Sequence, residues 1–204
     1  MGPYFTTLPI ACETPVKGIA VYGTQSRTWL EYLFDIVRSQ GIAGGKSYED
    51  ADETVRQVVQ MMALLILEGK SVDEVKKSHP QFAPLADAFF PRGRFNDKSL
   101  PFWRQLNQTN FATYWSKCNA RVLAVHGASD HVTYDVDHQL IADMVNRANP
   151  GYGKFEVIPD SDHLFHGWKT QRESIQNFGK GTYNPAFSKQ CVKEQKSMWI
   201  KITF

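Results

Sequence analysis

The chain has 204 residues, of which 42% are hydrophobic, and its 23 basic and 21 acidic residues leave a formal net charge of +2. This length suits one domain, or one domain with an inserted subdomain. The balanced charge argues against nucleic-acid binding, because no basic field attracts a phosphate backbone. The longest apolar run, from Met61 to Leu67, is too short to span a bilayer, so we expect no membrane span.

The first third of the chain predicts one strand and one helix. Residues 16–22 form a β-branched run closed by Gly23, which predicts a buried strand. Thr28 and Glu31 have the spacing of a capping box. The apolar residues that follow recur at helical spacing and predict a helix that ends at Gly41.

The pattern changes after the glycine-containing stretch 41–46, which resembles a hinge. Residues 48–69 predict a long amphipathic helix, and the capping box that begins at Ser71 predicts a shorter helix ending near Pro80. Residues 82–103 are aromatic and rich in Pro and Gly, without clear periodicity, and predict a loop.

We interpret residues 42–106 as a helical and aromatic cap inserted into a core formed by residues 1–41 and 107–204. A plain crossover helix with a long loop is the alternative interpretation. The cap aromatics suit either an apolar acyl group of a substrate or simple core packing. They are Phe82, Phe89, Phe90, Phe95, Phe102 and Trp103.

Alternation of helices and strands resumes at Asn110. The predicted elements are a helix at 111–115, a strand at 121–126, a helix from 136 that ends at 149–151, a strand at 154–158 and a closing helix at 185–199. The order of elements predicts an α/β fold with a parallel sheet.

Cysteine spacing predicts neither a disulfide framework nor a metal site, because Cys12, Cys118 and Cys191 lie far apart. No glycine-rich phosphate loop occurs either, so we expect no metal and no cofactor. No signal peptide is visible in the first twenty residues, but the compartment stays open because an export signal could precede Met1.

An acid and a histidine follow two successive predicted strands. Asp130 ends the turn after the strand at 121–126, and His163 follows the strand at 154–158. Parallel strands place such groups at one edge of the sheet, where a carboxylate can hold an imidazole in one tautomer. Ordinary turn chemistry for the aspartate and a structural role for the histidine are the alternatives.

The run from Val122 to Asp130, a helix, and the run from Phe155 to His163 together resemble the C-terminal part of the α/β-hydrolase family. In that family the acid lies in a Gly-x-x-Asp turn, and the histidine follows the next strand. The resemblance extends from about Val16 to the C-terminus. It implies a partial α/β-hydrolase fold, with strands six to eight and flanking helices.

Carried over residue by residue, the resemblance implies that Asp130 is the triad acid and that His163 is the general base. It leaves His126 as a structural neighbour of the turn. His131, His138 and His166 are expected at the surface or as supporting groups, and Asp160 and Asp162 are expected to shape the histidine loop.

The chain departs from the family at the nucleophile, because no Gly-x-Ser-x-Gly pentapeptide occurs in it. Met1 and Gly2 are similar to the last two residues of such an elbow, so we expect the serine to precede Met1 in a longer hydrolase. The terminal nitrogen of Met1 would then replace the family's oxyanion-hole N–H. The alternative is that Met1 is an ordinary start.

The resemblance implies a serine hydrolase that cleaves an ester, amide or peptide through an acyl-enzyme, with the nucleophile missing from this chain. The chain alone is then expected to be inactive. A non-catalytic hydrolase-like binding module is the alternative. Missing upstream strands would leave the strand at 16–22 with a free edge, which predicts self-association.

Overall fold

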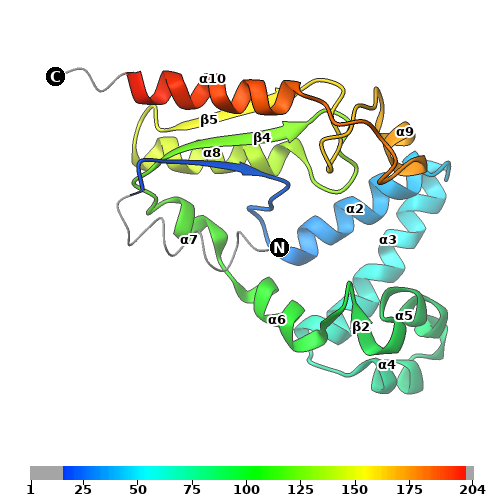
Figure 1. The fold of residues 1–204 in the computed structure, drawn as a ribbon. Coiled ribbons are helices and arrows are strands. Elements are labelled where there is room, and N and C mark those ends of the chain that lie inside the picture. Colours follow the sequence, from blue (N-terminus) through cyan, green and yellow to red (C-terminus); the bar gives the residue numbers. More distant parts are fainter. Residues whose placement is uncertain (1–15, 201–204) are drawn as a thin grey trace. The chain divides into compact units, whose positions relative to one another are not determined.

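The structure is a computed structural model that describes residues 16–200 (Figure 1). The expectations for Met1, Gly2 and Cys12 lie outside the described residues. Two compact units are present. Within the described residues, one contains 16–27 and 111–200, and the other contains Thr28–Asn110.

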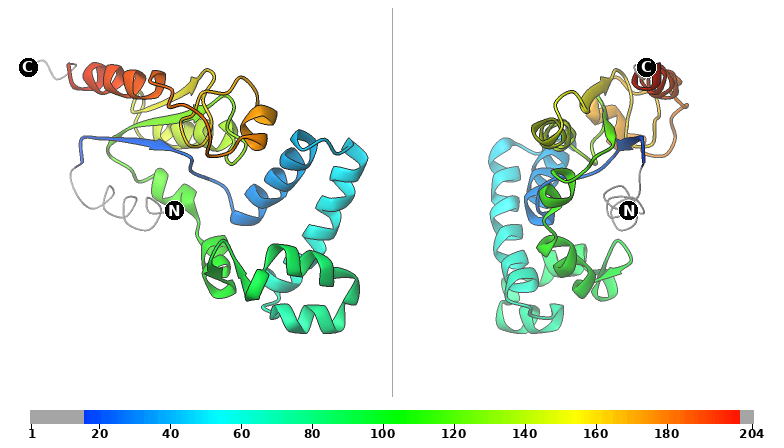
Figure 2. Two further views of the ribbon diagram at one scale, coloured as in Figure 1. Left: turned by 45° about the vertical axis from the view of Figure 1, so that its right-hand side comes forward. Right: turned by 90° about the vertical axis from the view of Figure 1, so that its left-hand side faces the viewer.

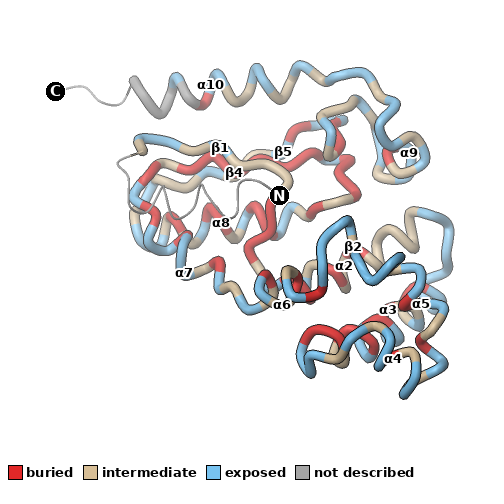
Figure 3. Tube along the Cα trace, turned by 60° about the horizontal axis from the view of Figure 1, so that its bottom comes forward, coloured by how far each residue is buried: buried red, intermediate tan, exposed pale blue. Residues whose placement is uncertain are grey.

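The first unit contains a parallel sheet with the strand order β1-β4-β5. These strands are Gly18–Tyr22, Arg121–Gly127 and Gly153–Ile158, so all three predicted strands are present. Strand β4 is central, and every residue in it except Arg121 is buried (Figure 3). The expectation that the first strand is buried was wrong: β1 lies at an edge of this sheet and is only partly covered.

Two helices cover the two faces of this sheet (Figure 2). Helix α8 (Asp135–Ala148) packs against β4 and β5, and α10 (Ala186–Ile200) packs against β1 and β4. Side chains alternate between the faces of a strand, which is why Leu123 and Val125 of β4 lie together under Phe187 of α10. Helix α7 (Phe111–Trp115) leads into β4.

The acid and histidine loops lie beyond the carboxyl ends of β4 and β5. The histidine loop is followed by a short helix, α9 (Gln171–Gln176), which Thr170 caps through the N–H of Glu173. Helix α9 is not predicted from the sequence, because six residues are too few to show helical periodicity.

The second unit is helical. It begins with α2 (Trp29–Ala43) and α3 (Tyr48–Met62), and α3 continues as a π-helical turn at Ala63–Leu67. The capping boxes predicted at Thr28 and Ser71 are both formed. The remaining elements are α4 (Val72–Ser78), a turn at Pro80–Phe82, α5 (Ala83–Phe89), a turn at Pro91–Gly93, a hairpin of β2 (Arg94–Phe95) with β3 (Lys98–Ser99), and α6 (Leu100–Gln108).

The loop expected at residues 82–103 is therefore largely regular structure. Its helices are short and begin with proline near their first turn, so they show little periodicity in sequence. The division between the two units falls at Arg27 and Asn110, whereas the sequence analysis placed the inserted region at 42–106. Helix α2 belongs to the helical unit because Trp29 stacks on Trp103, with ring centroids 4.5 Å apart.

Across residues 16–200, the structure has no helix with the length and apolar character needed to cross a membrane.

Candidate active site

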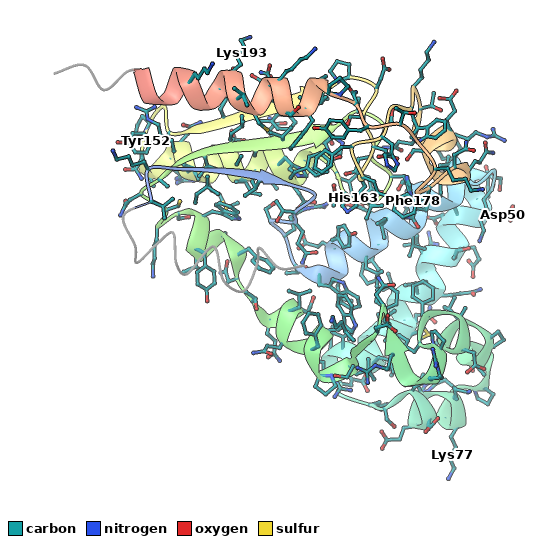
Figure 4. The ribbon with its side chains drawn as sticks, viewed as in Figure 1. Asp50, Lys77, Tyr152, His163, Phe178 and Lys193 are labelled. Atoms are coloured by element: carbon teal, nitrogen blue, oxygen red, sulfur yellow. The ribbon has the colours of Figure 1, made fainter. Side chains whose placement is uncertain are left out.

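The carboxyl ends of β1, β4 and β5 meet at one edge of the parallel sheet. Tyr22 ends β1, Asp130 lies in the turn after β4, and His163 lies in the loop after β5. Figure 4 shows His163 beyond the strand ends. The sheet thus brings Tyr22 together with Asp130 and His163, which follow it in the chain by more than a hundred positions.

Asp130 and His163, the two predicted site residues that the structure describes, are hydrogen-bonded to each other. Nδ1 of His163 lies 3.1 Å from Oδ2 of Asp130, and the Asp130 side chain is fully buried while that of His163 is 26% exposed. An ionised carboxylate only accepts hydrogen bonds, so Nδ1 is the donor. This leaves Nε2 as the acceptor nitrogen, and within residues 16–200 it makes no hydrogen bond.

Asp130 is fixed in place by the turn that follows it. Its Oδ1 accepts hydrogen bonds from the backbone N–H groups of Val132 (2.7 Å) and Thr133 (3.0 Å), and its Oδ2 accepts from the Thr133 hydroxyl at 2.6 Å. Burial acts to raise the pKa of Asp130, but the hydrogen bond and charge of His163 and the Thr133 bonds outweigh it. The pKa of Asp130 is therefore lowered, and the carboxylate stays ionised.

The histidine loop is shaped by Asp162, as expected. Its Oδ1 accepts hydrogen bonds from the N–H groups of Leu164 and His166, both at 2.8 Å, and so closes a tight turn around His163. The Tyr22 hydroxyl donates to the backbone carbonyl of Asp162 and ties this turn to β1. Burial and the neighbouring carboxylates Asp130 and Asp162 raise the pKa of Tyr22, so this donor stays protonated.

Gly23 allows the loop after β1 to approach the imidazole of His163 closely. Its φ is +60°, and a Cβ atom added there would lie 2.7 Å from Cε1 of His163. Only glycine combines this backbone conformation with this contact. Sequence reasoning placed Gly23 at the end of a strand but did not connect it with His163.

The same loop is anchored by the first turn of α8. The buried carboxylate of Asp137 accepts hydrogen bonds from the N–H and hydroxyl of Ser26 and forms an ion pair with Arg27 at 3.0 Å. The next residue, His138, accepts a hydrogen bond from the N–H of Thr24 at 3.4 Å. None of these anchoring contacts was predicted, because they join residues about 110 positions apart.

Three further histidines lie behind the Asp130–His163 pair. His126, His131 and His138 are buried, whereas His166 is partly exposed. The expectation that His131 and His138 could lie at the surface was therefore wrong. Burial lowers the pKa of His126, His131 and His138, which favours their neutral forms. Despite this density of imidazoles, the described part of the chain contains no group of three ligating side chains arranged to hold a metal ion.

The cap aromatics form the core of the helical unit. Phe82, Phe90 and Trp103 are buried, and Phe95 packs between Phe90 and Trp103, with its ring centroid 5.9 Å and 5.2 Å from theirs. Core packing therefore explains Phe82, Phe90 and Trp103, whereas Phe89, Phe95 and Phe102 are partly exposed.

The helical unit also contains a hollow of about 420 Å³. Buried Phe90 and Leu100 line it together with the charged side chains of Asp73, Lys76 and Arg92. These charges suit a polar ligand better than an apolar one, and the lining contains no histidine.

No family model and no curated protein sequence matches the chain. Among solved structures, it is similar to one from Mycobacterium tuberculosis that is provisionally described as a non-heme bromoperoxidase. The identity is 19% and the TM-score is 0.42, over 94% of this chain and 62% of that one. The functional argument therefore depends on the geometry of the Asp130–His163 pair.

Proposed function

We propose that this chain carries the acid and the general base of a serine hydrolase of the α/β-hydrolase type, which cleaves an ester or amide through an acyl-enzyme. The observation that supports it is the 3.1 Å hydrogen bond between His163 and the buried carboxylate of Asp130, at the carboxyl edge of a parallel sheet. Asp130 would hold the Nδ1–H tautomer. Nε2 of His163 would then take the proton of the nucleophile and pass it to the leaving group.

The proposal needs a nucleophile, and the printed sequence has no Gly-x-Ser-x-Gly elbow. Met1 and Gly2 are similar to the last two residues of such an elbow, so a serine encoded directly before Met1 is what the first test looks for. Met1 and Gly2 lie outside the described residues, so their support is the sequence resemblance alone.

The first test is to sequence the DNA upstream of the Met1 codon. An open frame that encodes Gly-x-Ser directly before Met1 is the expected result. A protein extended by that frame should react with a fluorophosphonate probe and hydrolyse an activated ester. A stop codon, or a frame without serine at that position, would overturn the catalytic proposal.

The second test uses variants of the extended protein. Asp130→Asn and His163→Ala are each expected to lower turnover by about 10³- to 10⁴-fold or more. Asp143→Asn, on an exposed position of α8, and His79→Ala, in the helical unit, are the matched controls and should leave turnover unchanged. Equal turnover in Asp130→Asn and Asp143→Asn would contradict the role of the acid.

A non-catalytic binding module is the second candidate. The hollow of about 420 Å³ in the helical unit favours it, because this hollow can accept a ligand without any nucleophile. Its charged lining predicts a small polar ligand, so a thermal-shift screen of amino acids and dicarboxylates on the present chain is the appropriate experiment. Charge reversal by Arg92→Glu should remove any stabilisation, whereas Arg172→Glu, an exposed position of the other unit, should not.

A further inference from the structure

Helix α9 connects the acid turn and the histidine turn. Gln171 donates a hydrogen bond from Nε2 to the backbone carbonyl of Asp130 at 2.9 Å. One turn later in the same helix, the hydroxyl of Ser174 lies 2.9 Å from Nδ1 of His131 and 3.1 Å from Oδ2 of Asp162. His131 directly follows Asp130, and Asp162 directly precedes His163.

The direction of these hydrogen bonds follows from their chemistry. Asp162 is a carboxylate and can only accept, so the single hydroxyl proton of Ser174 is donated to it. Oγ of Ser174 must then accept from His131, which fixes His131 in its Nδ1–H tautomer. Ser174 and Asp162 are fully buried and His131 is 6% exposed, so water offers no easy replacement for either bond.

The contacts of Asp162 extend this link to the imidazole of His163. One carboxylate oxygen of Asp162 binds Ser174, and the other closes the turn around His163 through the N–H groups of Leu164 and His166. Any shift of the Asp162 carboxylate therefore moves the backbone on both sides of His163. A second contact runs between the two turns directly, from the N–H of Ser129 to the carbonyl of Ser161 at 2.9 Å.

We infer that Ser174 is a positioning residue, which sets the geometry of the Asp130–His163 pair by holding the two turns in register through His131 and Asp162. The description of the pair as catalytic rests on the proposed function. The positioning itself does not, since it concerns a hydrogen bond that the chain forms without substrate or nucleophile.

The test is NMR of the imidazole groups in the present chain, labelled with ¹⁵N-histidine. In the wild type, His163 is expected as the Nδ1–H tautomer, with a slowly exchanging proton shared with Asp130. In Ser174→Ala, exchange of this proton should accelerate by about fivefold to tenfold, as expected when a buried hydrogen bond that supports it is lost. Mixed His163 tautomers should appear as well.

The matched control is Asn146→Ala. Asn146 donates a hydrogen bond to the carbonyl of Gly153 and accepts from the N–H groups of Gly151 and Gly153, at the amino end of β5 and away from both turns. Its removal should lower stability and leave exchange at His163 unchanged. Equal acceleration in Asn146→Ala and Ser174→Ala would mean general loosening and would overturn the inference, as would unchanged exchange in Ser174→Ala.

Two measurements cover the case in which Ser174→Ala fails to fold. Ser174→Cys keeps a group of similar size with a weak donor, and it should accelerate exchange at His163 as well. The wild type alone gives the other measurement: His131 must be the Nδ1–H tautomer, and an Nε2–H tautomer would overturn the inference. Because neither readout requires turnover, an inactive extended protein would refute the proposed function and leave this result standing.

Discussion

His138 is a buried histidine that the fold holds in its neutral form. Its side chain is fully buried, and Nδ1 lies 2.7 Å from the carbonyl oxygen of Tyr134. A carbonyl only accepts, so Nδ1 carries the proton and Nε2 accepts from the N–H of Thr24. A second proton on Nε2 would face that N–H, and burial already lowers the pKa of His138 from 6.5 to about 4.

This shift predicts that the stability of the protein falls in mild acid. The unfolded chain binds a proton at His138 below about pH 6.5, whereas the folded chain binds it only near pH 4. The stabilising contribution is therefore complete above pH 6.5 and is lost as the pH falls towards 4. With these two values, the loss between about pH 7.5 and about pH 4.5 amounts to about 2 to 3 kcal/mol of unfolding free energy.

Urea unfolding of the wild type and of His138→Gln at the two pH values measures this loss. The variant should be less stable than the wild type at pH 7.5 but should lose about 2 to 3 kcal/mol less on acidification. The lowered pKa values of His126 and His131 contribute to the slope of both proteins, so the difference between the two proteins reports mainly on His138. His79→Gln, a partly exposed histidine of the helical unit, is the control and should follow the wild type. An equal loss in wild type and His138→Gln would refute the reasoning.

Three further variants test other contacts. Asp137→Asn removes the buried negative charge that pairs with Arg27 and holds the loop after β1. This variant should lower the free energy of unfolding in urea by about 3 kcal/mol. Arg104→Met removes donors to two backbone carbonyls, one of them that of Leu65 in the π-helical turn, and should cost about 2 kcal/mol in the same assay. Ala20→Lys places a charge at an exposed position of β1. If the chains associate through the edge of β1, this charge should reduce the concentration-dependent association measured by sedimentation, without lowering the free energy of unfolding. Association that persists in this variant would exclude the β1 edge as its cause.

The strands and the Asp130–His163 pair could be predicted from the sequence because their signals are local. A β-branched run marks each strand, and parallel strands must bring their following turns to one edge. The long helices α3 and α8 carry clear periodicity for the same reason. Thr133 lies three positions after Asp130, a spacing at which a threonine hydroxyl often donates to a preceding aspartate. This spacing therefore also indicates the hydrogen bond that fixes Asp130.

The remaining contacts could not be predicted because they are non-local and made by short elements. Buried His131 contacts Ser174 and Phe178, and buried His138 contacts Thr24 and His126, and no residue pattern near either histidine shows these contacts. Helices α5 and α9 have seven and six residues, which is less than two full helical turns. The aromatic residues of the helical unit are hydrophobic, but the same residues are typical both of a protein core and of an apolar binding site, so the sequence does not distinguish the two.

The two unpredicted anchors follow one common arrangement. Helix α8, which follows the acid turn, holds the loop after β1 through Asp137 and His138. Helix α9, which follows the histidine turn, holds the acid turn through Gln171 and Ser174. Each loop at this edge of the sheet is thus fixed by a helix that lies later in the chain, so no loop depends on its own residues alone. The hydrogen bond between Asp130 and His163 joins two loops that are both held in this way, which gives the positional precision that the proposed role of His163 as a general base would require.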